Sequence, residues 1–471
     1  MKSRSLAALA SIALGSVFSL GTQQVMAQQF PENNIGPPYI LGLAHGIKGT
    51  LWQPPDPSNS HVGIVTVHRT SNYLNHPSCS NLSQRGFTVF CMNTRFDDNE
   101  TLVNFELLAQ DVGVAVNYLK NTLHMNKVIL LGHSGGGPTS TYYQAVAVNG
   151  PSYCQDPLKL SECASTGPNS VAGLIPADGI VLLDAHPSVA VNLLRGIDPS
   201  IKDNQDRETV GVGGNNEPIK RDEKLFLYNP DNGFNTTLNG LSDYSKQFQR
   251  KYTTAEAGRM NDWIDQAQHA QALIAEGNWR FPDDDSMIIA AAGGSVAGGG
   301  SEAAIFKPDN KIWCCTFQPE QVLTNDGSII TENYTSVRLP NGGDYPGILT
   351  FDQGTKNLTI TSFLTANAIR ATDALDYNQI DWCSTNDSVP CALQHITTPI
   401  LMVGMGAYYF FPDMERYYRN YSASPDKTFI IAAGLVHGLS PCGNCPGGPY
   451  DNMENNMWNY IAKWIQTRYG T

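Results

Sequence analysis

Short runs of apolar, β-branched and aromatic residues recur along the chain, and stretches with apolar positions at helical spacing separate them. Continuous apolar runs of this length are typical of strands that a parallel sheet buries on both faces. The runs that we interpret as strands are 61–67, 87–93, 128–131, 180–183, 400–403 and 428–432. This alternation predicts βαβ crossovers, and therefore an α/β fold with a mostly parallel sheet and helices on both faces.

The middle of the chain breaks this rhythm. Residues 201–397 are polar and punctuated by Asn, Asp and Gly, with one helix predicted at 254–276. Strand and helix patterns then resume and end in an amphipathic helix at 450–469. We therefore interpret 28–200 and 398–471 as one sheet domain into which 201–397 is inserted.

The first residues have the pattern of a secretory signal peptide. Lys2 and Arg4 precede an apolar stretch at 6–20, and Val25-Met26-Ala27 places small residues where a signal peptidase cleaves. Residues 1–27 are therefore predicted to be removed, which makes the mature protein secreted or periplasmic. A membrane anchor is disfavoured because the run is short and rich in Ser, Gly and Ala, and no later stretch reaches spanning length.

The ten cysteines lie close together in pairs along the chain, which agrees with export. Local disulfides are the simplest interpretation, although spacing alone does not fix the connectivity. The pairs are Cys79 with Cys91, Cys154 with Cys163, Cys314 with Cys315, Cys383 with Cys391, and Cys442 with Cys445. The last pair has zinc-ligand spacing, but no second Cys or His pair stands at the distance of a zinc finger, so we expect no metal site.

The composition is that of a globular protein, with 41% hydrophobic and 15% charged residues and a formal net charge of −13. We find no cluster of Lys and Arg, so nucleic acid and anionic membranes are disfavoured as partners. The sequence carries no signal for an oligomeric state.

The most specific motif is Gly132-His133-Ser134-Gly135-Gly136, which follows the strand 128–131 and precedes a helix-like run at 138–148. A strand that turns sharply into a helix strains its corner residue and needs flanking glycines, and it projects the serine hydroxyl above the sheet. The N–H of Gly135 would then point to where a substrate oxyanion forms. A nucleotide-binding turn is disfavoured because the glycine spacing is wrong and no acidic ribose ligand follows, so we expect no cofactor.

With this motif the chain resembles the α/β-hydrolase superfamily, over about 39–199 and 398–469. In that family the nucleophile, the acid and the histidine follow one another in the chain, and the histidine comes after the last strand. His437-Gly438, behind the strand 428–432, matches that ending. The resemblance therefore implies Ser134 as nucleophile and His437 as base.

The resemblance also implies two oxyanion donors, one from Gly135 and one from the loop after the strand 61–67. That loop departs from the HGGG form of many esterases. Arg69 is our candidate for the second N–H, with Thr70 as the alternative.

In that family the acid lies at one of two places along the chain. The usual one, after the penultimate strand, falls on Ala407, with Asp413 and Glu415 a little later near a helix start. The other is the end of the preceding strand, where Asp184 stands. We favour Asp184, because a buried strand beside the one that carries Ser134 holds it rigidly.

Together these features predict an exported serine hydrolase that cleaves a small-molecule carboxylic ester, with 201–397 as a cap that shapes the pocket. An acyltransferase or a peptidase could use the same triad. A catalytically silent binding module of this fold is the alternative from another class.

Overall fold

The predicted strands lie side by side in one sheet of a computed structural model, which describes residues 36–201, 221–227, 229–234, 243–278, 286–290, 314–337 and 355–471. The strands of this sheet are β1 (Tyr39–Gly42), β2 (Lys48–Trp52), β3 (Val62–Val67), β4 (Thr88–Asn93), β5 (Lys127–His133), β6 (Gly179–Leu183), β8 (Glu320–Leu323), β9 (Ile329–Glu332), β11 (Ile400–Met405) and β12 (Lys427–Ala432). Their order is β1-β2-β4-β3-β5-β6-β11-β12-β8-β9, parallel from β4 to β8 and antiparallel at both edges. The mostly parallel α/β fold is thereby confirmed.

Side chains of the central strands alternate between two apolar layers, which explains their continuous apolar runs. Ile64 and Ile129 face the layer that includes α1 (Pro77–Ser83) and α10 (Met453–Tyr469). Val65 and Leu130 face the opposite layer. The helices of that second layer are α2 (Phe105–Asn117), α3 (Gly136–Asn149), α4 (Val189–Leu194), α5 (Lys246–Ala275), α7 (Ile360–Ala366), α8 (Val389–Leu393) and α9 (Phe411–Asn420). Helices therefore cover both faces, as predicted.

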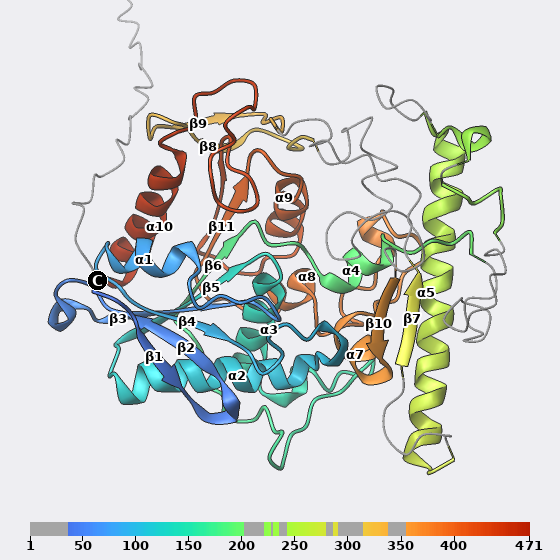
Figure 1. The fold of residues 1–471 in the computed structure, drawn as a ribbon, viewed down its shortest axis with the longest axis horizontal. Helices are drawn as coiled ribbons and strands as arrows, with labels where there is room; N and C mark the ends of the chain where they lie inside the picture. The colour runs from blue at the N-terminus through green and yellow to red at the C-terminus, as the bar shows by residue number, and fades with distance from the viewer. Residues whose placement is uncertain are drawn as a thin grey trace, which may run out of the picture.

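Part of the region between the two halves of the sheet domain packs against the outer side of that second layer. The helix α5 lies next to a small antiparallel sheet of β7 (Ser286–Ala290) and β10 (Thr355–Thr359), at the end of the molecule opposite α10 (Figure 1). Helix α5 begins at Lys246, well before the predicted start at 254, because the Ser245 side chain accepts a hydrogen bond from Phe248 N and caps it.

Another part of this region belongs to the main sheet. β8 pairs in parallel with β12, and β9 pairs with β8 at the sheet edge. The assignment of all of 201–397 to an inserted cap is therefore wrong for Glu320–Glu332. The sequence pattern missed these strands because they are short and mix buried side chains, such as Val322 and Leu323, with exposed polar ones.

The five predicted disulfides are confirmed, at Cys79–Cys91, Cys154–Cys163, Cys314–Cys315, Cys383–Cys391 and Cys442–Cys445. Cys383 and Cys391 also lie near His395, but a disulfide leaves neither thiolate free to bind a metal. No described helix is both long and apolar enough to cross a membrane. The predicted signal peptide, 1–27, lies outside the described residues.

Candidate active site

Ser134 occupies the turn between β5 and α3 with a backbone φ of 56°. This left-handed conformation is strained for a residue with a side chain. A Cβ on Gly132 would lie 2.3 Å from the carbonyl oxygen of Gly136, and a Cβ on Gly136 would lie 2.1 Å from that of Val67. Gly132 and Gly136 are therefore required, because backbone passes too close to them for any side chain.

Asp184 directly follows β6 and is completely buried. Its backbone also has a positive φ, 40°, and its N–H donates to the carbonyl of Val403 at 2.8 Å. Its Oδ1 accepts a hydrogen bond from the N–H of Met405 at 3.1 Å. Two neighbouring strands, β6 and β11, thus fix the backbone and the carboxylate of Asp184.

His437 lies on the loop after β12, between Ser134 and Asp184. Its Nδ1 is 2.6 Å from Oδ2 of Asp184, and its Nε2 is 3.0 Å from Oγ of Ser134. The ring of Tyr408 stacks on the imidazole at 4.6 Å, and Phe410 meets it edge-on at 5.3 Å. The structure therefore brings the three residues predicted from sequence into one line of hydrogen bonds.

The two alternative acids bind other partners. Asp413 accepts a hydrogen bond from Nη1 of Arg195 at 3.1 Å and forms a second ion pair with Arg416. The carboxylate of Glu415 accepts the N–H groups of Phe317 and Gln318. Burial raises the pKa of Glu415 to about 7. Both side chains hold α9 against its neighbours rather than orienting His437.

The two predicted oxyanion donors are the backbone N–H groups of Gly135 and Arg69. Gly135 is the N-cap of α3, and neither its N–H nor that of Arg69 has a hydrogen-bond acceptor among the described residues. The N–H of Thr70, the alternative donor, is directed at Nδ1 of His68, 3.1 Å away. The N–H of Arg69 is therefore available to donate a hydrogen bond to a substrate. Its role as the second oxyanion donor stays a prediction.

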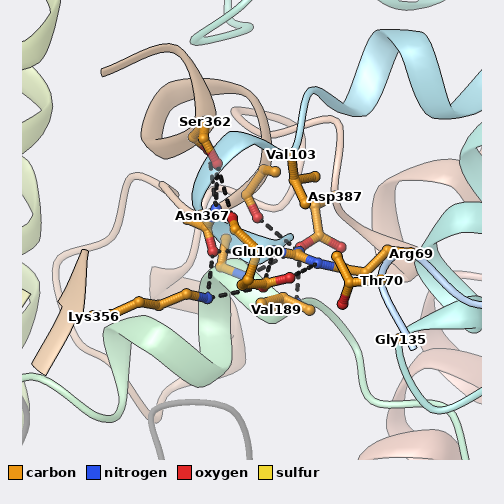
Figure 2. A network of polar contacts seen from close by, with 12 residues as sticks. Arg69, Thr70, Glu100, Val103, Gly135, Val189, Lys356, Ser362, Asn367 and Asp387 are labelled. Atoms are coloured by element: carbon orange, nitrogen blue, oxygen red, sulfur yellow. Dashed lines mark hydrogen bonds and ion pairs between the residues drawn. The ribbon is translucent and has the colours of Figure 1, made fainter. Parts of the chain in front are cut away.

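The side chain of Arg69 points away from Gly135 into a polar network that is buried except for the half-buried Glu100 (Figure 2). Its guanidinium binds Glu100 and Asp387, and Lys356 of β10 binds Glu100 in turn. Although burial opposes ionisation, the charges of Arg69 and Lys356 hold the pKa of Glu100 well below its ordinary value. The network therefore ties the loop after β3 to β10.

Sequence reasoning missed several histidines around the site. A Cβ on Gly135 would lie 2.7 Å from Nε2 of His68 and 3.4 Å from Nε2 of His186. Desolvation lowers the pKa of His68 to about 3 and that of His186 well below its ordinary value, so both rings are neutral at pH 7. The signal available in the sequence was position, since His68 directly follows β3, His133 ends β5 and His186 comes shortly after β6.

No family model and no curated protein matches the sequence. Among solved structures, the chain is similar to Est1E from Butyrivibrio proteoclasticus, with 9% identity, 93% of this chain and 100% of that chain covered, and a TM-score of 0.38. The siderophore hydrolase EstB from Aspergillus fumigatus has 8% identity, coverages of 93% and 99%, and a TM-score of 0.41. The alpha/beta hydrolase GrgF from Penicillium sp. sh18 has 11% identity, coverages of 92% and 99%, and a TM-score of 0.39.

The assignment of the fold rests on the chain's own architecture. In α/β-hydrolases a strained turn from strand to helix exposes a serine at the carboxyl edge of a mostly parallel sheet, and the acid and the histidine follow it in that order. β5 and α3 form that turn around Ser134, with Asp184 and His437 behind it in the chain. The described part of the chain therefore has the α/β-hydrolase fold.

Proposed function

We propose that the protein is an exported serine hydrolase that cleaves a carboxylic ester through Ser134, His437 and Asp184. The observation that carries the proposal is the pair of contacts made by His437, 2.6 Å to the carboxylate of Asp184 and 3.0 Å to the hydroxyl of Ser134. A base within hydrogen-bonding distance of a hydroxyl, itself oriented by a third group, is the mark of an activated nucleophile.

In the first half of the reaction, Oγ of Ser134 attacks the ester carbonyl and Nε2 of His437 takes the hydroxyl proton. The carboxylate of Asp184 accepts the Nδ1–H of His437, which fixes the tautomer and stabilises the imidazolium. The tetrahedral intermediate collapses, the proton passes from His437 to the leaving alkoxide, and an alcohol departs from the acyl-enzyme.

In the second half, water attacks the acyl-enzyme while His437 again accepts a proton. The carboxylic acid leaves as the proton returns to Oγ of Ser134. The N–H of Gly135, at the start of α3, would stabilise the oxyanion in both halves, together with the N–H of Arg69. Removing one such donor typically costs about a hundredfold to a thousandfold in kcat.

Export is supported by two independent features. The first 27 residues have the pattern of a cleaved signal peptide. All ten cysteines pair in disulfides, which form and persist in oxidising compartments. Both features support secretion or a periplasmic location.

The test is hydrolysis of p-nitrophenyl and aryl esters of graded acyl length by the mature protein. We expect turnover, and we expect Ser134→Ala and His437→Ala each to remove nearly all of it. The double variant should be scarcely worse than either single one, because residues that act as a unit are not additive. His61→Ala, at an exposed position, is the matched histidine control.

The outcomes separate the alternatives. Clearly additive losses, or activity that survives Ser134→Ala, would contradict the shared mechanism. Transfer of the acyl group to an added alcohol or amine in preference to water would favour an acyltransferase, and cleavage of amides over esters would favour a peptidase. A folded wild type with no turnover of any ester would favour the silent binding module.

A further inference from the structure

His133 immediately precedes Ser134 in the motif and is the last residue of β5. Its Nε2 lies 2.8 Å from the backbone carbonyl oxygen of His437. Two consecutive residues of the nucleophile turn therefore hold the same histidine, Ser134 through the imidazole of His437 and His133 through its backbone. The two contacts span 303 and 304 positions in the sequence.

The direction of this hydrogen bond is fixed, because a carbonyl oxygen can only accept. Nε2 of His133 must carry a proton, so in the neutral ring Nδ1 is an acceptor. Nε2 of His76 lies 3.1 Å from that Nδ1. The hydroxyl of Tyr73 lies 3.1 Å from the carbonyl oxygen of His133 and 3.2 Å from the same Nδ1, and it can donate to either acceptor.

The contacts of His76 lead independently to the same position for the proton of His133. The backbone N–H of Ser78 donates to Nδ1 of His76 at 3.2 Å, and an N–H can only donate. The neutral ring of His76 must then carry its proton on Nε2, which faces Nδ1 of His133. The hydrogen bonds thus run in one direction, from Ser78 through His76 and His133 to His437.

Burial keeps the imidazole rings of His76 and His133 neutral. His133 is 8% exposed and His76 is 7% exposed. Desolvation lowers the pKa of His76 to about 3 and that of His133 well below its ordinary value, so neither ring is protonated at neutral pH. A charged His76 would have no acceptor left for the N–H of Ser78.

We propose that His133 is a positioning residue that holds the backbone of His437 and thereby sets the distance between the imidazole of His437 and the hydroxyl of Ser134. The role rests on the proposed function, because it serves the proton transfer from Ser134 to His437. The loop that carries His437 has a positive φ at Leu439, and strained backbone persists only where the surroundings hold it. Misplacing a reacting group by about 1 Å can cost a hundredfold in rate.

Two substitutions test the two ring nitrogens of His133 separately. His133→Asn keeps an acceptor near the place of Nδ1 and loses the donor to His437. His133→Gln keeps a donor near the place of Nε2 and loses the acceptor for His76. We expect His133→Asn to lower kcat by about tenfold to a hundredfold with KM nearly unchanged. We expect His133→Gln to retain most of the wild-type kcat.

A merely structural role predicts another result. The two variants would then lose kcat equally, or His133→Gln would lose more, and either outcome overturns the role of His133. Thermal unfolding of each variant shows whether it is folded. If His133→Asn does not fold, nitrogen NMR of the ¹⁵N-histidine-labelled wild type still decides. A proton on Nε2 of His133 supports the proposal, and a proton on Nδ1 overturns it.

Failure of the proposed function is distinguishable from failure of this role. A wild type that hydrolyses no ester and whose Ser134 is unreactive overturns both. A wild type that hydrolyses esters through Ser134, while the Asn and Gln variants behave alike, overturns only the role of His133.

Discussion

Nδ1 of His437 lies 2.6 Å from Oδ2 of Asp184, although the two residues are 253 positions apart in the chain. Asp184 is completely buried, and Met405 N–H holds its other carboxylate oxygen. A carboxylate fixed in this way can hold an imidazole in one tautomer and stabilise its charged form. This relationship distinguishes Asp184 from the other acids that the sequence offers.

Replacement of Asp184 by Asn should preserve the fold and favour the wrong tautomer of His437. We expect kcat for ester hydrolysis to fall by up to about ten-thousand-fold, as in other triads. Steady-state kinetics on one p-nitrophenyl ester measures this loss.

Asp413→Asn and Glu415→Gln are the matched controls. We expect kcat to stay within about tenfold of the wild type for both, because these carboxylates bind partners around α9. Asp413→Asn should instead lower the midpoint of thermal unfolding, since it weakens the buried ion pair with Arg195. If Asp413→Asn or Glu415→Gln loses nearly all activity while Asp184→Asn keeps the wild-type kcat, the acid is misassigned.

Gly136→Ala tests the close approach of backbone at the nucleophile turn. The added Cβ would lie 2.1 Å from the carbonyl oxygen of Val67, so β3 or the turn must move. We expect a lower unfolding midpoint together with a loss of activity. The control is Gly258→Ala in α5, where a Cβ meets nothing within 4 Å and helix propensity should add about 0.5–1 kcal/mol of stability. Equal effects from the two substitutions would contradict this account.

The sequence predicts the central sheet and the position of Ser134 well, because both depend on local pattern. The apolar run before Gly132 specifies a buried strand, and the glycines around Ser134 specify the turn. The cysteine pairs are also local, and each is found as predicted. The residues that form the strand, the turn and each disulfide are all close in sequence, and the largest separation, between Cys79 and Cys91, is 12 positions.

What the sequence leaves open depends on contacts between distant segments. The choice among Asp184, Asp413 and Glu415 follows from which of them reaches His437, and no local pattern carries that information. The same holds for His133, whose acceptor lies 304 positions away. The strands β8 and β9 were missed because pairing places them, β8 against β12 and β9 against β8, and neither is a continuous apolar run.

Glu106 should make stability depend on pH. It is buried in α2, its Oε1 accepts the amide of Asn386 at 2.9 Å, and desolvation raises its pKa from 4.5 to about 7. Below about pH 4.5 the carboxyl is protonated in both the folded and the unfolded state, so it costs nothing. Between there and pH 7 only the folded state keeps the proton, so stability falls as pH rises, by about 3 kcal/mol at most.

Glu106→Gln removes this titration and keeps an amide oxygen for Asn386. We expect the variant to be more stable than the wild type at pH 8 and nearly equal to it at pH 4. Chemical unfolding of both proteins across this range isolates Glu106 from other titrating groups. A stability difference that does not change with pH would contradict the assignment.

The disulfide Cys79–Cys91 should be among the stabilising ones, since it joins α1 to β4 inside a fully buried layer. Replacing both cysteines by Ser removes the cross-link and buries two hydroxyls. We expect a loss of about 3 kcal/mol or more in the free energy of unfolding. The partly exposed pair Cys314–Cys315, which closes almost no loop, is the control and should cost much less. Equal losses would argue against a cross-link effect.

The central claim is that His437 activates Ser134 as a nucleophile, and covalent labelling tests it most directly. The mature protein is incubated with a fluorophosphonate, which phosphonylates an activated serine, and the labelled peptide is mapped by mass spectrometry. The account predicts one label on Ser134, no label in Ser134→Ala and strongly slowed labelling in His437→Ala. A label on another serine, labelling at an undiminished rate in His437→Ala, or a folded wild type that takes up no label would contradict it.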